Sequence, residues 1–509
     1  LNIKKNVRII KEAFFKMSTT SNILKKLDGM LIINGKLVAA ERSDEKIKNP
    51  ATGEIVGMVG VSTAKEVDAA VNAARGAFLK WGKSSPTNRT RYLHRIGELI
   101  EEDSESLAEI LTMEQGKPLK EAHGEILKLA ETFHFYAEEA VRINGETIPN
   151  DSLHFDSIVI REPIGVVAAI TPWNYPAELV GWKLCAALAA GCTIVVKPAE
   201  ITPFTALAIG WKCTQAALPP GVVNVVTGSG SKVGQALVEN KLIDKIAFTG
   251  SSEVGLRIQK SATSIKKMSL ELGGNCPLIV TANANIDDAV KGAIRRSFRN
   301  CGQICIAINR IYVDHTKYNE FITKLASLTK SLVVANGLNN PEADLGAIAS
   351  EDSLNKTKKH LEDALIKGAR LVAGGSRPVG TELQNGRYFL PTVLVDCNHE
   401  MDIMKEETFG PIVGVSKFSE LSKALNMAND TPYGLAAYVF SKNIDEIKYL
   451  SSNLDYGNVA VNNVDAGIIN APYGGRKQSG IGYEHGREGM LEYTNFKHIR
   501  TKFTSLDGG

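Results

Sequence analysis

Val166-Val-Ala-Ala-Ile170 opens a series of four short runs rich in β-branched residues and alanine, followed by Thr193-Ile-Val-Val196, Val222-Val-Asn-Val-Val226 and Lys245-Ile-Ala-Phe248. Segments with helical character separate these runs. The alternation is typical of βαβ units, which build a parallel sheet covered by helices on both faces. Because ligands bind at the carboxyl ends of the strands in such a sheet, the pattern predicts an α/β fold with a Rossmann-type, dinucleotide-binding domain.

Helical patterns precede these runs, and a second α/β pattern comes after them. Apolar residues recur at helical spacing from Val67 to Trp81 and from Leu93 to Leu111, which predicts two amphipathic helices. From Pro277-Leu-Ile-Val280 onward, strand and helix signals alternate again as far as Val461. We therefore expect a second α/β domain. No linker-like composition separates the halves, so they should pack closely.

The composition indicates a soluble globular enzyme. The chain has 509 residues, of which 44% are hydrophobic and 23% charged, so two or more domains are expected. With 59 basic and 56 acidic residues the net charge is +3, which does not favour a nucleic acid partner. The most apolar stretch, Leu179 to Val196, is interrupted by Lys183, whereas a membrane span needs ~20 apolar residues. It predicts a buried helix followed by a strand, and no membrane partner.

Cysteine and histidine usage points to a reducing compartment and to catalysis without a metal. The seven cysteines are an odd number and include no C-x-x-C pair, so a disulfide framework is not expected. We therefore expect a cytoplasmic location. The nine histidines form no H-E-x-x-H motif and no cluster with cysteines. The chemistry should therefore come from organic groups and a cofactor.

The first sixteen residues are basic and precede the first methionine, Met17; the basic residues are Lys4, Lys5, Arg8, Lys11 and Lys16. This composition has some similarity to a transit peptide. An extended start or a flexible tail is the favoured interpretation.

Two motifs carry groups suited to covalent catalysis. Cys305 ends Phe298-Arg-Asn-Cys-Gly-Gln-Ile-Cys305, and Glu271 opens Glu271-Leu-Gly-Gly-Asn275. A thiol near a glycine is a candidate nucleophile, and a carboxylate on a Gly-Gly turn is a candidate base for water. We expect Cys305 in an exposed turn at the start of a helix, where the helix dipole lowers the pKa of a thiol. A buried, inert thiol is the alternative, and for Cys301 a structural role is favoured over a redox role.

Two further motifs, Thr171-Pro-Trp-Asn-Tyr-Pro176 and Lys197-Pro-Ala-Glu200, each follow an apolar run. In this order, and with the cysteine and glutamate motifs, they resemble the aldehyde dehydrogenase superfamily. The resemblance extends from about Leu31 to about Lys502. It implies NAD(P)-dependent oxidation of an aldehyde to a carboxylic acid, through a thiohemiacetal and a thioester on the cysteine.

The resemblance assigns three catalytic roles. Cys305 is the nucleophile, and Glu271 is the base that activates water for hydrolysis of the thioester. Asn174 would donate to the developing oxyanion together with the backbone N–H of Cys305, although an asparagine in a turn can also be a simple turn former. Acylating relatives that transfer the acyl group to coenzyme A lack this carboxylate, so Glu271 favours release of the free acid.

The resemblance also implies a cofactor site. Lys197 and Glu200 are expected at the adenosine ribose, where a carboxylate accepts hydrogen bonds from both hydroxyls and repels a 2′-phosphate. NAD is therefore favoured, although some relatives with this glutamate also use NADP. Two glycine-rich turns lack the usual G-x-G-x-x-G spacing and are weak signals by themselves; the resemblance places the second under the pyrophosphate. Glu407 and Phe409 are expected at the nicotinamide ribose and ring; the alternative is that they are only an acidic loop with a core aromatic residue. The remaining expected contacts are Thr171, Pro172, Trp173, Gly230, Gly234, Phe248, Thr249, Gly250, Ser251 and Leu272.

The substrate is less well indicated. Within the superfamily the chain looks most like succinate-semialdehyde dehydrogenases, and Arg299 matches one of their carboxylate-binding arginines. A second arginine is expected at a position where this chain has Trp182. A carboxylated aldehyde such as succinate semialdehyde is one candidate. Trp182 could instead line an apolar entrance for neutral aldehydes, or be an ordinary core residue.

The resemblance also implies a domain organisation and a homodimer or homotetramer. Residues 1–30 would be an N-terminal extension, for which disorder is one option. Residues 31–147 and 166–273 would bind the cofactor, residues 274–476 would form the catalytic domain, and the polar β-rich segments 148–165 and 491–505 would form an arm that pairs with a neighbouring subunit. A catalytically silent member of the fold is the rival hypothesis, and it predicts damage to the catalytic residues, which are intact in this chain.

Overall fold

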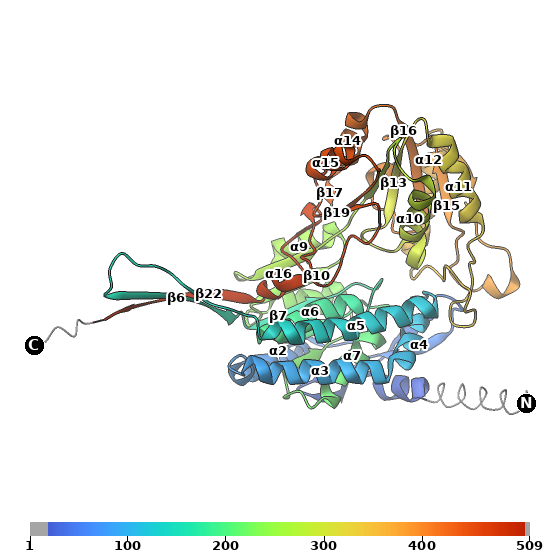
Figure 1. The fold of residues 1–509 in the computed structure, drawn as a ribbon. Helices are drawn as coiled ribbons and strands as arrows, with labels where there is room; N and C mark the ends of the chain where they lie inside the picture. Colours follow the sequence, from blue (N-terminus) through green and yellow to red (C-terminus); the bar gives the residue numbers. More distant parts are fainter. Residues whose placement is uncertain (1–18, 504–509) are drawn as a thin grey trace, which may run out of the picture.

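The computed structural model describes residues 19–503, which fold into two α/β lobes and a protruding β-arm (Figure 1). The expectations for residues 1–16 lie outside this range. Residues 19–27 belong to the expected extension, yet they are helical, and Leu24 and Leu27 are buried in the core of the first lobe. Leu24 and Leu27 are three residues apart, so they lie on the same face of this helix.

The first lobe is built on an eight-stranded sheet whose five central strands are parallel. Antiparallel partners close both edges. In spatial order the strands are β2 (Lys36–Ala39), β1 (Met30–Ile33), β9 (Val223–Val225), β8 (Thr193–Lys197), β7 (Val166–Ile170), β10 (Lys245–Thr249), β11 (Lys267–Glu271) and β21 (Gly480–Ile481).

Helices cover both faces of this sheet, as the alternating pattern predicts. Val166, Ala168 and Ile170 of β7 pack in one core with α2 (Ala64–Trp81), α8 (Gln235–Glu239) and α9 (Ser252–Ser261). Val167 and Ala169 face the opposite core, because successive strand residues point to opposite faces. That core contains α3 (Pro86–Glu102), α4 (Ser104–Gln115), α5 (Leu119–Ala140), α6 (Glu178–Ala190) and α7 (Pro203–Gln215).

The helical pattern of Leu93 to Leu111 corresponds to two helices rather than one. Helix α3 ends and α4 begins at Asp103, whose backbone is not helical (φ −108°, ψ 18°). The buried helix and strand expected between Leu179 and Val196 are α6 and β8. Lys183, the residue that interrupts this apolar run, is fully buried.

The second lobe contains a seven-stranded sheet that is parallel except for the edge strand β14. Its order is β14 (Arg370–Ala373), β15 (Thr392–Val395), β16 (Ile412–Phe418), β13 (Ile308–Asp314), β12 (Cys276–Val280), β18 (Ala436–Phe440) and β19 (Asn458–Val461). The helices of this lobe are α10 (Ile286–Phe298), α11 (Tyr318–Lys330), α12 (Glu351–Ile366), α13 (Asp402–Lys405), α14 (Leu421–Asn429) and α15 (Ile444–Asn453).

Smaller elements complete the fold. The chain returns from the second lobe to the first through β21, and α16 (Gly486–Leu491) then packs against α6. Two short two-stranded sheets pair β3 (Glu45–Lys48) with β4 (Ile55–Val59) and β17 (Tyr433–Gly434) with β20 (Arg476–Lys477). The arm is a three-stranded antiparallel sheet that projects from the lobes (Figure 1); its strands are β22 (Thr494–Lys502), β6 (Phe155–Pro163) and β5 (Glu146–Thr147).

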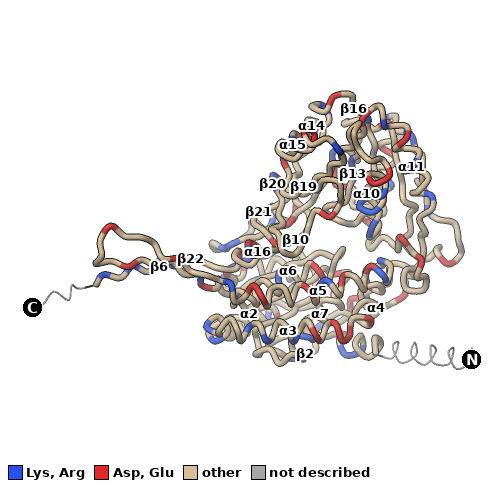
Figure 2. Tube along the Cα trace, viewed as in Figure 1, with Lys and Arg blue, Asp and Glu red and all other residues tan. Residues whose placement is uncertain are grey.

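The surface carries both signs of charge. Acidic and basic residues are interspersed over the two lobes and along the arm (Figure 2). Within residues 19–503, no helix has both the length and the apolar character needed to cross a membrane.

Candidate active site

Two cavities meet at Cys305. The first cavity is lined mainly by residues that follow the carboxyl ends of β7, β10 and β11, together with a loop of the second lobe: Pro172, Trp173, Thr249, Gly250, Ser251, Leu272, Gly273, Glu407 and Phe409. The second cavity is lined by Lys128, Tyr175, Glu178, Trp182, Arg296, Arg299, Tyr473 and His485, among others. Cys305 and Asn174 line both cavities. Groups that occupy the two cavities would therefore approach each other at this thiol.

A tight loop places Cys305 between the 3₁₀ turn η2 (Arg299–Gly302) and strand β13. Asn300 (φ 49°) and Cys301 (φ 55°) adopt the left-handed conformation, which is unfavourable for residues with a side chain. Gly302 continues it, and a Cβ there would lie 2.2 Å from the carbonyl oxygen of Gly410. The expected helix start is therefore wrong: Cys305 lies in an irregular loop before a strand.

The thiol of Cys305 is also harder to ionise than the sequence suggested. Burial raises its pKa to about 12, although a hydrogen bond with the Tyr473 hydroxyl acts in the opposite direction. A helix dipole would have lowered the pKa, but no helix starts at this residue. Cys301 is buried, and its thiol donates to the carbonyl oxygen of Gly346 over 3.2 Å, in keeping with a structural role.

Glu271 is the last residue of β11 and is 4% exposed. Neither carboxyl oxygen has a hydrogen-bond partner within residues 19–503. Burial, reinforced by the nearby carboxyl of Glu484, raises the pKa of Glu271 well above its ordinary range. Burial therefore favours the protonated form of the carboxyl group, which must lose its proton before it can act as a base.

A buried ion pair that the sequence did not reveal lies next to Glu271. The Lys183 ammonium donates to Glu484 and to the Thr249 hydroxyl, both over 2.5 Å, and the Lys183 and Glu484 side chains are almost fully buried. Lys183 opposes the rise in the pKa of Glu271. The one available signal was the interruption of an apolar run by this lysine.

A second buried network holds Asn174. Its side-chain amide donates to the backbone carbonyl oxygen of Gln303 over 3.0 Å. The backbone carbonyl oxygen of Asn174 accepts from the side chains of Lys117 and Asn300 at 2.8 and 2.9 Å. Lys117 also forms a fully buried ion pair with Glu125 at 2.6 Å. An amide nitrogen carries two hydrogens, so Asn174 keeps one donor for a group bound beside Cys305.

The residues expected at the adenosine ribose lie outside the first cavity. Lys197 Nζ is 3.6 Å from Glu200 Oε1, and Glu200 also accepts from the backbone N–H of Gly230. Glu200 is 44% exposed, and a Cβ added at Gly234 would meet nothing within 4 Å. An exposed acceptor beside the exposed Gly230 fits a ribose that approaches from solvent.

The first cavity itself fits the nicotinamide half of a dinucleotide. Ser251 caps the N-terminus of α9, where unpaired backbone N–H groups favour phosphate. Glu407 accepts from the backbone N–H of Gly274 over 3.0 Å, and burial raises the pKa of Glu407 to about 7. Phe409 lies edge-on to Trp173, with ring centroids 5.3 Å apart.

Two of the other expected cofactor residues do not reach this cavity. Phe248 packs in the core of the first lobe, because its position in β10 turns its side chain inward. The hydroxyl of Thr171 is buried without a partner within residues 19–503.

The second cavity combines cationic and aromatic side chains. Arg299 is partly exposed and lies 3.8 Å from Glu121, while Arg296 pairs with Asp465 at 3.1 Å. Trp182 packs edge-on against His485, with centroids 4.0 Å apart. The structure thus brings both expected substrate residues into one cavity with His485 and Tyr473, which the sequence did not single out because they lie far along the chain.

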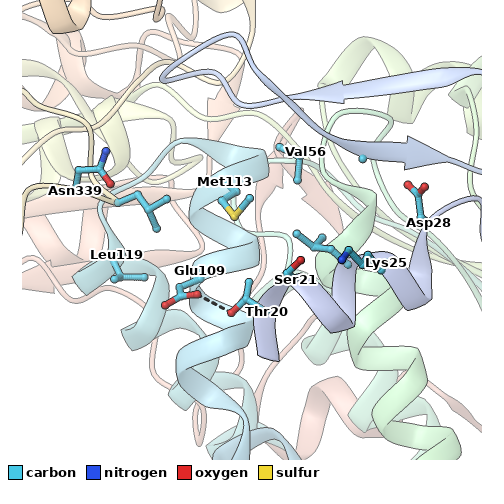
Figure 3. A pocket seen from close by; sticks show the side chains of 12 residues that line it. Thr20, Ser21, Lys25, Asp28, Val56, Glu109, Met113, Leu119 and Asn339 are labelled. Carbon is cyan, nitrogen blue, oxygen red and sulfur yellow. Dashed lines mark hydrogen bonds between the residues drawn. The ribbon is translucent and has the colours of Figure 1, made fainter. Parts of the chain in front are cut away.

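The size of a cavity does not identify the site. A larger cavity of about 570 Å³ lies beside the helix of residues 19–27, where the Thr20 hydroxyl donates to Glu109 over 2.6 Å (Figure 3). It is mainly apolar, with Leu24, Met113 and Leu119 in its wall. None of the expected site residues lines it.

The strand ends of a Rossmann-type sheet lie on one side of the Cys305 thiol, and a second cavity lies on the other. This is the arrangement expected of a dinucleotide-dependent dehydrogenase that acts on a carbonyl compound. Comparison with known proteins makes the class specific. The model of the aldehyde dehydrogenase family matches residues 37–499. The chain belongs to this family.

Known relatives cover almost the whole chain. A 3-sulfolactaldehyde dehydrogenase of Pseudomonas putida is 42% identical over 471 residues, which are 92% of this chain and 96% of the relative. An NADP-dependent succinate-semialdehyde dehydrogenase of Escherichia coli is 42% identical over 473 residues, with the same coverage. The crystal structure of betaine aldehyde dehydrogenase from Staphylococcus aureus in complex with NAD⁺ is 34% identical and has a TM-score of 0.93, covering 97% of this chain and 99% of that one.

These findings confirm the expected family, the fold class and the enzymatic activity. The protein is an NAD(P)-dependent oxidoreductase that oxidises aldehydes. The hypothesis of a catalytically silent member of the fold is not favoured.

Proposed function

We propose that this enzyme oxidises a small aldehyde with an anionic far end, of which succinate semialdehyde is an example, to the free acid, with Cys305 as its nucleophile. The observation that carries the proposal is the position of Cys305 where the two cavities meet, with Asn174 beside it. The partly exposed guanidinium of Arg299 supplies a cation in the second cavity. The relatives named above as 3-sulfolactaldehyde and succinate-semialdehyde dehydrogenases support a substrate of this class.

The first half-reaction forms a thioester. The Cys305 thiolate attacks the carbonyl carbon, and the oxyanion that forms accepts hydrogen bonds from the free amide hydrogen of Asn174 and the backbone N–H of Cys305. The first cavity would hold an oxidised nicotinamide, which would supply the acceptor for the hydride that leaves this carbon. The carbonyl double bond re-forms, and the acyl group stays on the sulfur.

The second half-reaction releases the acid. Water adds to the thioester carbon while Glu271 takes its proton, and Cys305 leaves as the thiolate. Glu271 can do this only when ionised, and burial raises its pKa, so hydrolysis requires proton loss from this carboxyl group. Lys183 lies close enough to favour the charged form of the carboxyl, which supports this role.

For the cofactor, we infer a preference for NAD over NADP. Glu200 presents an exposed carboxylate next to Gly230, where a ribose hydroxyl could donate to it and a 2′-phosphate would be repelled. The neighbouring Lys197 is almost fully buried, so it offers little to such a phosphate.

The domain roles and the assembly belong to the same proposal. Residues 31–147 and 166–273 would bind the cofactor and residues 274–476 would carry the nucleophile. Segments 148–165 and 491–505 would pair with another copy of the chain, giving a homodimer or homotetramer. The arm supports this, because Phe496 on β22 is 66% exposed beside the exposed edge of a sheet. The seven free cysteines fit a cytoplasmic location.

A matrix of kcat/KM values tests the proposal. Succinate semialdehyde, a neutral aldehyde of similar length and a cationic aldehyde would each be assayed with NAD and with NADP. We expect the anionic aldehyde with NAD to give the highest value. A higher value for the neutral aldehyde would contradict the role of Arg299, and equal values for the two nucleotides would contradict the role of Glu200.

A further inference from the structure

The sulfur of Cys305 has one side-chain hydrogen-bond partner within residues 19–503. The Tyr473 hydroxyl lies 3.6 Å from Sγ, and in the same range this is the hydroxyl's sole hydrogen bond. Tyr473 is 2% exposed, so water does not compete freely for this hydroxyl. A buried tyrosine hydroxyl aimed at the proposed nucleophile requires a chemical explanation.

Tyr473 is held firmly in this position. Its backbone N–H donates to the carbonyl oxygen of Glu484, and the backbone N–H of Glu484 donates back, both over 2.7 Å. Its ring packs against those of Trp182 and His485, each with a centroid distance of 5.5 Å, and these two rings contact each other. The paired backbone hydrogen bonds and these ring contacts together hold the hydroxyl beside Cys305.

The direction of the hydrogen bond depends on the state of the sulfur. Burial, and then the neighbouring Cys305 and Glu271, raise the pKa of Tyr473 well above its ordinary value, so the phenol keeps its proton. Next to a neutral thiol either group can donate. Next to a thiolate only the phenol can donate, and a hydrogen bond to an ionised acceptor is about twice as strong as one between neutral groups.

We propose that Tyr473 is a further catalytic residue, whose hydroxyl donates a hydrogen bond to the Cys305 thiolate and stabilises the reactive form of the enzyme. The inference rests on the proposed role of Cys305. This hydrogen bond explains how the Cys305 thiol can ionise in a buried loop, where it has neither a helix dipole nor a cationic partner. The hydrogen bond weakens as sulfur bonds to the aldehyde carbon and loses its charge.

Removal of the Tyr473 hydroxyl should have two opposing effects on the reactivity of Cys305. A hydrogen bond to an ionised group lowers the pKa of the acceptor by about one unit, so its loss reduces the thiolate fraction about tenfold below the pKa. The remaining thiolate is more basic and about threefold more nucleophilic. The net rate at a pH below the pKa should therefore fall about threefold.

The test is alkylation of the full-length enzyme by iodoacetamide between pH 7 and pH 10, without substrate or nucleotide, with the modified residue identified by mass spectrometry. We expect Tyr473→Phe to react at Cys305 about threefold more slowly than wild type at pH 8. Tyr388→Phe is the matched control, because Tyr388 is equally buried and its hydroxyl donates to the carbonyl oxygen of Ala51 over 3.3 Å. The control should react like wild type.

A second measurement remains informative if Tyr473→Phe folds poorly. Incorporation of 3-fluorotyrosine at position 473 keeps the shape of the side chain and makes the phenol a stronger donor. It should shift the alkylation profile to lower pH, opposite to Tyr473→Phe. An unchanged profile in both variants would overturn the inference, and modification of a residue other than Cys305 in the wild-type enzyme would instead overturn the proposed nucleophile.

Discussion

The two cavities that meet at Cys305 are built in different ways. The first is lined by runs of consecutive residues at strand ends, such as Thr249-Gly-Ser251 at the end of β10 and Leu272-Gly273 after β11. The second draws on single residues from distant segments, including Lys128 of α5, Trp182 of α6 and His485 before α16. Short sequence motifs can therefore encode a cofactor site, whereas the recognition of one particular aldehyde depends on side chains that come together only after folding.

The cavities also differ in charge. The first contains the carboxyl of Glu407, whose pKa lies near neutrality. The second is lined by three cationic side chains and two acidic ones, so cations are in excess; these residues are Lys128, Arg296, Arg299, Glu178 and Asp465. The difference fits a cofactor whose ribose hydroxyls donate hydrogen bonds on one side and an anionic substrate on the other.

The most severe test removes the thiol shared by both cavities. In Cys305→Ala we expect kcat/KM to fall by at least about 10⁴-fold, because loss of a nucleophile removes the covalent route. Mass spectrometry should find no acyl adduct on the variant. Cys301→Ala is the control, since this thiol lies four residues away and lines neither cavity. Substantial turnover in Cys305→Ala would show that the cavities do not meet at the reacting group.

A smaller but still large effect is expected at the base. Glu271→Gln should slow hydrolysis of the acyl-enzyme about 10²- to 10⁴-fold, because an amide cannot take a proton from water. Formation of the thioester should continue, so a burst of NADH close to one equivalent per subunit should precede a slow steady state. Loss of the burst itself would place Glu271 in the first half-reaction instead.

The second cavity can be tested through its substrate preference. Trp182→Arg should raise kcat/KM for succinate semialdehyde relative to a neutral aldehyde of similar length by about tenfold or more, because a second guanidinium adds a charge-assisted contact with the carboxylate. Trp182→Phe provides a control for the lost indole. No change in the ratio would mean that the substrate's far end does not reach this position.

The smallest effect should come from the first cavity and depends on pH. The pKa of Glu407 is raised to about 7, so its carboxyl group is mostly protonated below pH 7 and ionised above it. An ionised carboxylate accepts hydrogen bonds from ribose hydroxyls more strongly, so KM for NAD should fall a few-fold, roughly two- to fourfold, as pH rises from 6 to 8. Glu407→Gln should remove this dependence. The same pH dependence in the variant would assign it to another group.

Sequence reasoning succeeded where a property depends on neighbours along the chain. The strands β7, β8, β9 and β10 were each expected within a few residues of their observed positions, because their apolar runs are short and bounded by helical segments. The expected helix at Cys305 was wrong, since glycine near a cysteine indicates a tight loop but does not distinguish a helix from a strand after it. The left-handed residues Asn300 and Cys301 are held by hydrogen bonds with distant segments, to the backbone carbonyl oxygens of Asn174 and Gly346 respectively.

The buried ionic groups were the least accessible to sequence reasoning. Lys183 and Glu484 are 301 residues apart, yet their side chains are 2.5 Å apart in the fold. Lys117, which precedes α5, and Glu125, within α5, form a buried pair, and the sequence alone does not show that both side chains are buried. Such pairs are stable only when the fold excludes water and supplies both partners, so their presence follows from packing.

The amino-acid sequence was sufficient to specify a family, a pair of α/β lobes and a reactive thiol, because local patterns and short motifs encode these features directly. Only the tertiary structure decided the pKa shifts of that thiol and of Glu271. It also brought Tyr473, Trp182 and His485 together in the lining of the second cavity. The physical reason is that burial and charge proximity, which set a pKa, are properties of three-dimensional surroundings and have no counterpart in the order of residues.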